Sequence, residues 1–116
     1  MDYNKLLLDI EKATKVLVEV NKGIAGIFLQ EIKPVRFIFL TYIASPRPDK
    51  VCLGQCIHVY PINEIQIRIR QGWQNTAIHE LVHLYNPGSS ERQVVKTTKD
   101  VIKYLKMKEK EYFRKE

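Results

Sequence analysis

The sequence predicts an α+β fold: an N-terminal helix, a small mixed or antiparallel sheet of three or four strands, and two C-terminal helices. Three observations predict it. Apolar residues recur every three or four positions near both ends of the chain, they alternate with polar residues in the middle, and Pro and Gly separate these segments. A chain of 116 residues can bury one core without disulfides or a metal ion. We therefore expect residues 1–116 to form a single domain.

The N-terminal segment has one apolar stripe at helical spacing, formed by Leu6, Ile10, Ala13, Leu17 and Val20. This stripe predicts a helix from about Asp2 to Asn21, and Gly23 is a residue suited to end it. The next stretch, GIAGIFLQEI (residues 23–32), fits either a strand loosened by glycine or a turn followed by a strand.

Three segments predict the sheet. Residues 35–42, VRFIFLTY, are β-branched, aromatic and nearly apolar on both faces, which is typical of a central strand. Prolines and Asp predict a loop at residues 44–50, ASPRPDK. The segments 56–61 (CIHVYP) and 64–72 (EIQIRIRQG) alternate in polarity, and we expect both to be strands, with a short helix as the alternative for the second.

After Gly72 the pattern becomes helical from Trp73 to about Tyr85. The Asn-Pro-Gly sequence at residues 86–88 must break this helix, because the residue before a proline resists helical backbone angles. Ser90 and Gln93 then have the spacing of a capping box, which predicts a second helix from Glu91 to about Lys108.

The first of these helices contains the sequence HELVH. His79 and His83 are four positions apart and therefore lie on one face of the helix, about 130° from the apolar stripe of the same helix. Two neutral imidazoles at this spacing can bind Zn²⁺, and Glu80 can then act as general base toward a water whose pKa the metal lowers. Two surface histidines beside a solvated glutamate are the simpler alternative, but the separate apolar face favours a zinc site.

A catalytic zinc usually has three protein ligands and one open position. No histidine follows His83, so a carboxylate is expected, and Glu91, Asp100, Glu109 and Glu111 are the candidates. Glu91 falls within the inward stripe of the second helix, whereas Asp100 faces away from it. The turn at residues 86–89 should bring Glu91 back toward His83. We therefore expect one Zn²⁺ per chain, bound by His79, His83 and Glu91, although Glu91 could instead only interact with the helix dipole.

The HELVH sequence and the following glutamate resemble the gluzincin branch of the zincin metallopeptidases. At this length the resemblance is to the minimal single-domain members from archaea called minigluzincins. It is strong over residues 79–91 and extends further only through the order of elements. It implies peptide-bond hydrolysis with His79, His83 and Glu91 as zinc ligands and Glu80 as general base, and a peptide or protein substrate. It also implies that an edge strand beside the cleft binds the extended substrate by main-chain pairing.

The sequence does not assign a role to several further residues. His58, Arg92 and Tyr104 are candidates for stabilising the transition state, without a basis for ranking them. The tail at residues 106–116 alternates in charge and contains Tyr112 and Phe113. Such a tail is most simply a solvated chain end, but it could also cover the cleft of its own chain, or that of a second copy in a homodimer, and keep the peptidase latent as a zymogen.

The net charge of +6 allows an alternative: a non-catalytic zinc-containing module that uses a basic surface to bind nucleic acid or a protein. Nucleic acid is the less favoured partner, because much of the excess charge lies in the tail.

The two cysteines fit free thiols in a reducing compartment, so we expect a cytoplasmic protein. The N-terminus lacks the pattern of a signal peptide, and charged residues interrupt the longest apolar stretch, so we expect no contact with a membrane.

Overall fold

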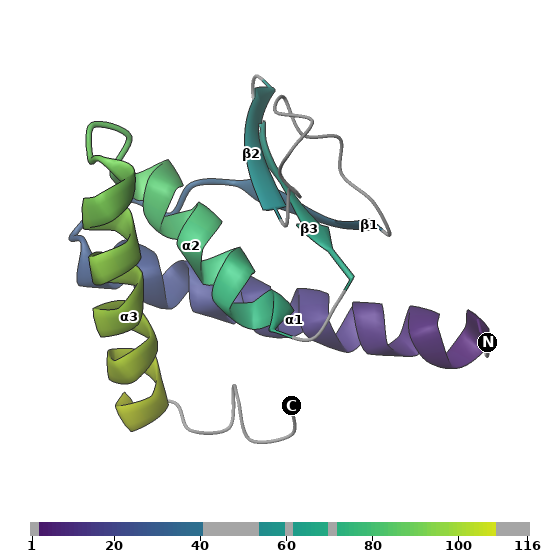
Figure 1. Ribbon diagram of the computed structural model, residues 1–116. Coiled ribbons are helices and arrows are strands. Elements are labelled where there is room, and N and C mark those ends of the chain that lie inside the picture. Colours follow the sequence, from purple (N-terminus) through teal and green to yellow (C-terminus); the bar gives the residue numbers. More distant parts are fainter. Residues whose placement is uncertain (1–2, 41–53, 60–61, 70–71, 109–116) are drawn as a thin grey trace.

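The computed structural model describes residues 3–40, 54–59, 62–69 and 72–108. They form, in chain order, helix α1 (Tyr3–Ile27), strands β1 (Val35–Leu40), β2 (Gly54–Val59) and β3 (Ile62–Arg68), and helices α2 (Trp73–Tyr85) and α3 (Glu91–Lys108). Figure 1 shows the described helices gathered on one side of the sheet, with α2 nearest to it. The predicted α+β fold is confirmed, as are the predicted bounds of the last two helices.

The three described strands form one mixed sheet in the order β1–β3–β2. Strand β3 pairs in parallel with β1 and antiparallel with β2. β3 is therefore central, and Ile65 and Ile67 on its inner face are fully buried. The prediction that residues 35–42 form a central strand is wrong for the described sheet. Although β1 is nearly apolar on both faces, it pairs only with β3 among the described strands.

Helix α1 is longer than predicted and ends at Ile27 instead of near Asn21. Glycine weakens a helix locally, but the next turn buries Ile24 and Ala25 almost completely. A Cβ on Gly23 would lie 3.4 Å from a methyl carbon of Leu105, so α1 and α3 approach closely at this point. Tertiary packing thus extends the helix past Gly23, the residue that was predicted to end it.

The C-terminus of α1 is closed by a Schellman motif. The N–H of Gln30 donates to the carbonyl of Ala25 at 2.9 Å, and the N–H of Leu29 donates to that of Gly26 at 3.2 Å. The residue in the left-handed conformation is Leu29, with φ of 53°, and its side chain is 93% exposed. A position that favours glycine is therefore occupied by an exposed leucine.

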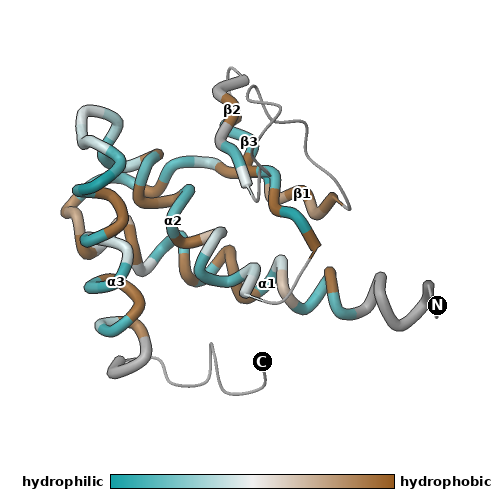
Figure 2. Tube along the Cα trace, viewed as in Figure 1, coloured by the Kyte–Doolittle hydropathy of each residue, from teal (hydrophilic) through white to brown (hydrophobic). Residues whose placement is uncertain are grey.

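The hydrophobic core joins α1, β3, α2 and α3. Figure 2 shows apolar residues on the parts of these elements that face one another. Edge-to-face packing of Phe39 on Trp73 extends the core to β1, with ring centroids 5.4 Å apart. The fully buried apolar side chains include Leu17, Ile24, Ile65, Ile67, Ile78, Leu81, Val82, Val94 and Leu105.

A buried polar group lies within this core at the end of α2. The hydroxyl of Tyr85 donates to Oδ1 of Asn21 at 2.7 Å and accepts from the N–H of Lys33 at 2.9 Å. The side-chain amide of Asn21 donates to the carbonyl of Lys33 at 3.0 Å. These bonds connect α1, the segment before β1 and α2. Burial raises the pKa of Tyr85 above its ordinary value, and the hydrogen bond from the N–H of Lys33 acts in the opposite direction.

Several predictions fall on residues outside the described ranges. They are the start of the first helix at Asp2, the loop at residues 44–50, parts of three strands at residues 41–42, 60–61 and 70–71, and the tail beyond Lys108. The described helices include none with both the length and the apolar character needed to cross a bilayer.

Candidate metal centre

Helix α2 presents its histidines away from the core because its apolar residues bury the opposite face. Ala77, Ile78, Leu81, Val82, Leu84 and Tyr85 are the buried residues of this helix. The side chains of His79 and His83 remain 23% and 30% exposed. Their rings meet edge to face with centroids 4.8 Å apart. The predicted common face is therefore present, and it is open to solvent.

A tight turn ends α2 and reverses the chain. The N–H of Asn86 donates to the carbonyls of Val82 and His83, at 3.0 and 3.3 Å, and its side-chain amide donates to Val82 as well. The N–H of Ser89 then donates to the carbonyl of Asn86 at 3.0 Å, which completes the turn. Asparagine thus supplies the last hydrogen bonds of α2 before Pro87 prevents its continuation.

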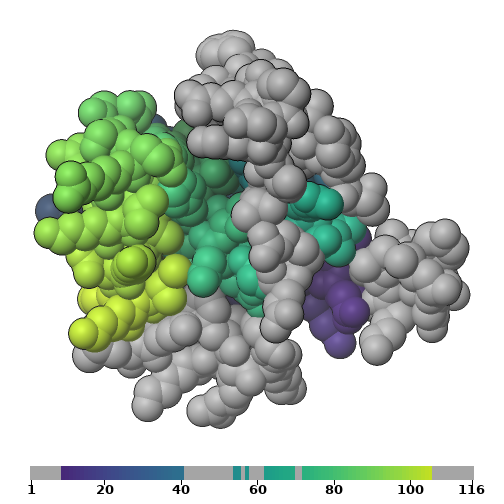
Figure 3. Space-filling model, in the orientation of Figure 1, coloured from purple at the N-terminus to yellow at the C-terminus, as the bar shows by residue number. Residues whose placement is uncertain are grey.

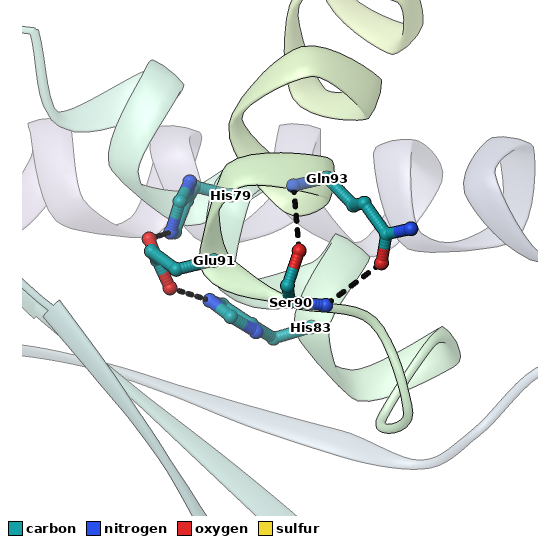
Figure 4. Close-up of polar contacts among 5 residues, drawn as sticks. All are labelled: His79, His83, Ser90, Glu91 and Gln93. Carbon is teal, nitrogen blue, oxygen red and sulfur yellow. Dashed lines mark hydrogen bonds and ion pairs between the residues drawn. The ribbon is translucent and has the colours of Figure 1, made fainter.

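The predicted capping box starts α3 immediately after this turn. The hydroxyl of Ser90 accepts from the N–H of Gln93 at 3.2 Å, and the side-chain carbonyl of Gln93 accepts from the N–H of Ser90 at 2.9 Å. Both bonds are drawn in Figure 4. They satisfy two backbone donors at the helix start and fix Glu91 as the first helical residue.

Glu91 reaches across from α3 to both histidines (Figure 4). Its Oε1 lies 2.7 Å from Nε2 of His79, and its Oε2 lies 2.8 Å from Nε2 of His83. An ionised carboxylate can only accept, so each Nε2 donates in this arrangement. The three residues form the one group of potential metal ligands found among the described residues, with ligand atoms within 4.8 Å of one another.

The donor set fits a zinc ion. Two imidazole nitrogens and one carboxylate oxygen are borderline ligands that suit Zn²⁺, and three protein ligands leave one tetrahedral position for a water or substrate. Zinc–ligand bonds of about 2.0–2.1 Å at tetrahedral angles separate two ligand atoms by about 3.3 Å. The carboxylate of Glu91 is 66% exposed, so it can withdraw by the small distance needed to admit an ion between the three side chains.

Glu80 lies beside this group without belonging to it. Its carboxyl is half-buried, and burial raises its pKa above the ordinary value. The nearby His83 acts in the opposite direction, and the charge of Glu91 adds to the rise. A carboxylate with a raised pKa accepts a proton more readily near neutral pH, as a general base requires.

The other candidate residues are not part of the triad. Asp100 is exposed on α3. Arg92 is exposed directly beside Glu91, and Tyr104 is 47% exposed three turns further along α3. His58 belongs to β2 opposite Asn63, but its side chain is outside the described part of the structure, as are Glu109 and Glu111.

One contact near the site has no signal in the sequence. Gly54 at the start of β2 lies against α2 at Thr76 and Glu80. Two segments that are more than 20 positions apart meet here, and no local pattern predicts such a contact.

Comparisons of the chain with protein families, with characterised proteins and with solved structures find no match.

Proposed function

We propose that the protein is a zinc-dependent metallopeptidase of the gluzincin type, with His79, His83 and Glu91 as metal ligands and Glu80 as general base. The main support is the position of Glu91. Its two carboxylate oxygens meet Nε2 of both histidines although it belongs to another helix. Because α2 buries its apolar face and α3 its own, the contact forms between side chains that remain partly exposed to solvent.

The chain's own residues then have distinct roles. A zinc ion at this site supplies a Lewis acid that polarises a carbonyl and lowers the pKa of a water. Glu80 lies one residue after His79, beside the pair and outside the triad. It takes a proton from the attacking water and delivers it to the leaving amine. Its half-buried position places this proton transfer away from bulk solvent.

An extended peptide is the expected substrate. Strand β2 is an edge strand of the described sheet, which makes its outer edge the candidate for main-chain hydrogen bonds with a peptide. The same strand contacts α2 at Glu80 through Gly54. A peptide paired with β2 would therefore pass close to the general base.

The proposal is tested by measuring zinc content and peptide hydrolysis together. We expect one zinc per chain in the wild type by elemental analysis, and the same content in Glu80→Gln, which retains every ligand. His83→Ala and Glu91→Ala should lose the metal. Wild type should cleave a library of internally quenched fluorogenic peptides, and Glu80→Gln should be at least about a hundredfold slower. A zinc-loaded protein that cleaves neither these peptides nor casein, both at full length and after removal of residues 109–116, would exclude the peptidase.

A second candidate function is supported by the solvent face of α3. Arg92, Lys96, Lys99 and Lys103 are all exposed, and steps of four, three and four residues place them on one face. This basic ridge extends for about 17 Å along the helix, opposite its buried side. In Figure 3, α3 forms one side of the visible surface. A non-catalytic zinc module could use the basic ridge to bind nucleic acid or an acidic protein.

The salt dependence of binding separates this candidate from the peptidase. If four cations contact phosphates, the logarithm of the affinity for a 20-base-pair DNA should fall with the logarithm of salt concentration, with a slope of about −3 to −4. Lys96→Glu combined with Lys99→Glu should abolish binding but retain zinc. No binding to DNA in 50 mM salt would rule out nucleic acid, and an acidic polypeptide such as polyglutamate would then be tested.

The cytoplasm remains the proposed location, because two cysteines in 116 residues are typical of thiols kept reduced. Titration of the purified, unfolded protein with a thiol reagent should find two free thiols per chain. An internal disulfide would favour an oxidising compartment instead.

A further inference from the structure

At Gly54 the sheet lies close to the face of α2 that carries Thr76 and Glu80. A Cβ built on this residue would lie 2.6 Å from Cγ2 of Thr76, 3.2 Å from the carbonyl oxygen of Gln66 and 3.4 Å from Cγ of Glu80. Real Cβ atoms essentially never come within 3.0 Å of another heavy atom. Any side chain at position 54 must therefore displace Thr76 or β2 itself.

The backbone conformation does not explain the glycine. Among the described glycines, only Gly72 has a positive φ, so Gly54 adopts angles that any residue can adopt. The space beside α2 is what excludes a side chain. Gly26 shows the opposite situation, since nothing lies within 4 Å of a Cβ placed there. The requirement at position 54 is thus specific to this contact.

Thr76 and Glu80 are four residues apart and form one row on α2, adjacent to the row of His79 and His83. The main chain of β2 crosses this row at Gly54, with the aliphatic part of Glu80 against it. Contact with a rigid strand restricts the rotamers of Glu80, which is already half-buried. The contact also sets the separation between the outer edge of β2 and the histidines.

We propose that Gly54 is a positioning residue for peptide hydrolysis. By lacking a side chain, it lets β2 lie directly on Thr76 and Glu80, which aims the Glu80 carboxylate and fixes the distance from the substrate-binding edge to the metal ligands. This inference rests on the proposed peptidase function. It assigns to an edge-strand glycine a role that acts through Glu80 without any contact of Gly54 with the metal.

The experiment compares Gly54→Ala, Thr76→Ser and the combination of both, with Gly26→Ala as the matched glycine control. Thr76→Ser removes the methyl carbon nearest to the added Cβ and keeps the hydroxyl. Zinc per chain, kcat and KM for one internally quenched fluorogenic peptide, and the denaturation midpoint are measured for each. In the metal-free wild type, a nuclear Overhauser effect is sought between the Hα protons of Gly54 and the methyl group of Thr76.

We expect Gly54→Ala to bind one zinc per chain and to lose roughly ten- to a hundredfold in kcat, with a much smaller change in KM, because a displaced general base impairs the chemical step. The same substitution in the Thr76→Ser background should lose several-fold less. Gly26→Ala should retain wild-type kinetics. The nuclear Overhauser effect should be strong without any metal.

Unchanged kcat in Gly54→Ala would overturn the proposal. So would equal losses in both backgrounds accompanied by loss of zinc, since these would indicate general unfolding. Absence of the nuclear Overhauser effect would overturn the contact itself. Failure of the peptidase function has a different signature, namely a zinc-loaded protein without hydrolysis both at full length and after removal of residues 109–116, and the role of Gly54 in catalysis then falls with it.

Discussion

The hydroxyl of Tyr85 donates a hydrogen bond of 2.7 Å to Oδ1 of Asn21, a residue 64 positions earlier in the chain. The same hydroxyl accepts from the N–H of Lys33, and the main-chain carbonyl of Tyr85 accepts from the side chain of Gln30 at 2.8 Å. The end of α2 is thereby attached to α1 and to the segment that follows it. Since His83 is two residues before Tyr85, these bonds also stabilise the helix end that carries a proposed metal ligand.

Tyr85→Phe should reduce the free energy of unfolding by about 1–3 kcal/mol, because Oδ1 of Asn21 and the N–H of Lys33 lose a buried partner. Chemical denaturation measures the loss. A double-mutant cycle with Asn21→Ala provides the control, since two residues in one network should show non-additive effects. Additive losses would mean that the pair does not interact energetically.

Leu29→Gly should stabilise the protein by about 0.5–1 kcal/mol. Leucine at a φ of 53° is strained, whereas glycine adopts this conformation readily, and the unfolded-state entropy of glycine offsets only part of the gain. Because the leucine side chain is 93% exposed, its removal sacrifices little packing. Leu29→Ala keeps the strain and serves as the control. A lower denaturation midpoint for the glycine variant would contradict the left-handed assignment.

Ser90→Ala should cost about 1 kcal/mol, because the N–H of Gln93 loses its acceptor at the start of α3. A frayed first turn also holds Glu91 less firmly, so zinc affinity should fall by up to about tenfold. Ser89→Ala is the matched control, since its hydroxyl has no hydrogen-bond partner among the described residues. Denaturation and competition with a zinc-binding dye measure the two effects. Equal behaviour of both variants would argue against the capping box.

Zinc should stabilise the folded protein by an amount that grows with the logarithm of its free concentration above the dissociation constant. At a free concentration of about 100 times the dissociation constant, the gain is about 2.7 kcal/mol, which corresponds to a rise in Tm of roughly 10 °C for a domain of this size. Glu91→Ala should lose most of this rise. Asp100→Ala removes an exposed carboxylate from the same helix and should retain it. A rise that is independent of Glu91 would indicate a different third ligand.

Deletion of residues 109–116 tests whether the tail makes the peptidase latent, and it leaves the described length of α3 intact. If the tail covers the cleft, the shortened, zinc-loaded protein should hydrolyse peptides several-fold faster, and a synthetic peptide of residues 106–116 should inhibit it. If a second copy supplies the tail, dilution of the full-length protein should also activate it. Unchanged hydrolysis after deletion would count against latency.

Local sequence patterns predicted the bounds of α2 and α3, the two helices that carry the candidate site, closely. The bounds of α2 follow from its apolar periodicity and from Pro87, and the start of α3 follows from the pairing of Ser90 with Gln93. These signals act over a few residues, through backbone angles and capping hydrogen bonds. The turn between the helices is so short that it restricts Glu91 to positions near the end of α2. The proximity of His79, His83 and Glu91 could therefore be predicted without knowledge of the fold.

The tertiary structure alone decided the features that depend on distant residues. Gly23 predicts a helix end, yet burial of Ile24 and close packing on Leu105 continue α1 to Ile27. The apolar pattern of β1 suits a central strand, but β3 takes the centre of the described sheet because parallel pairing brings β1 to one side. The contact of Gly54 with Glu80 and the bond between Tyr85 and Asn21 arise in the same way. Each of these contacts depends on the packing free energy of the whole domain, and a short segment of sequence contains no information on that free energy.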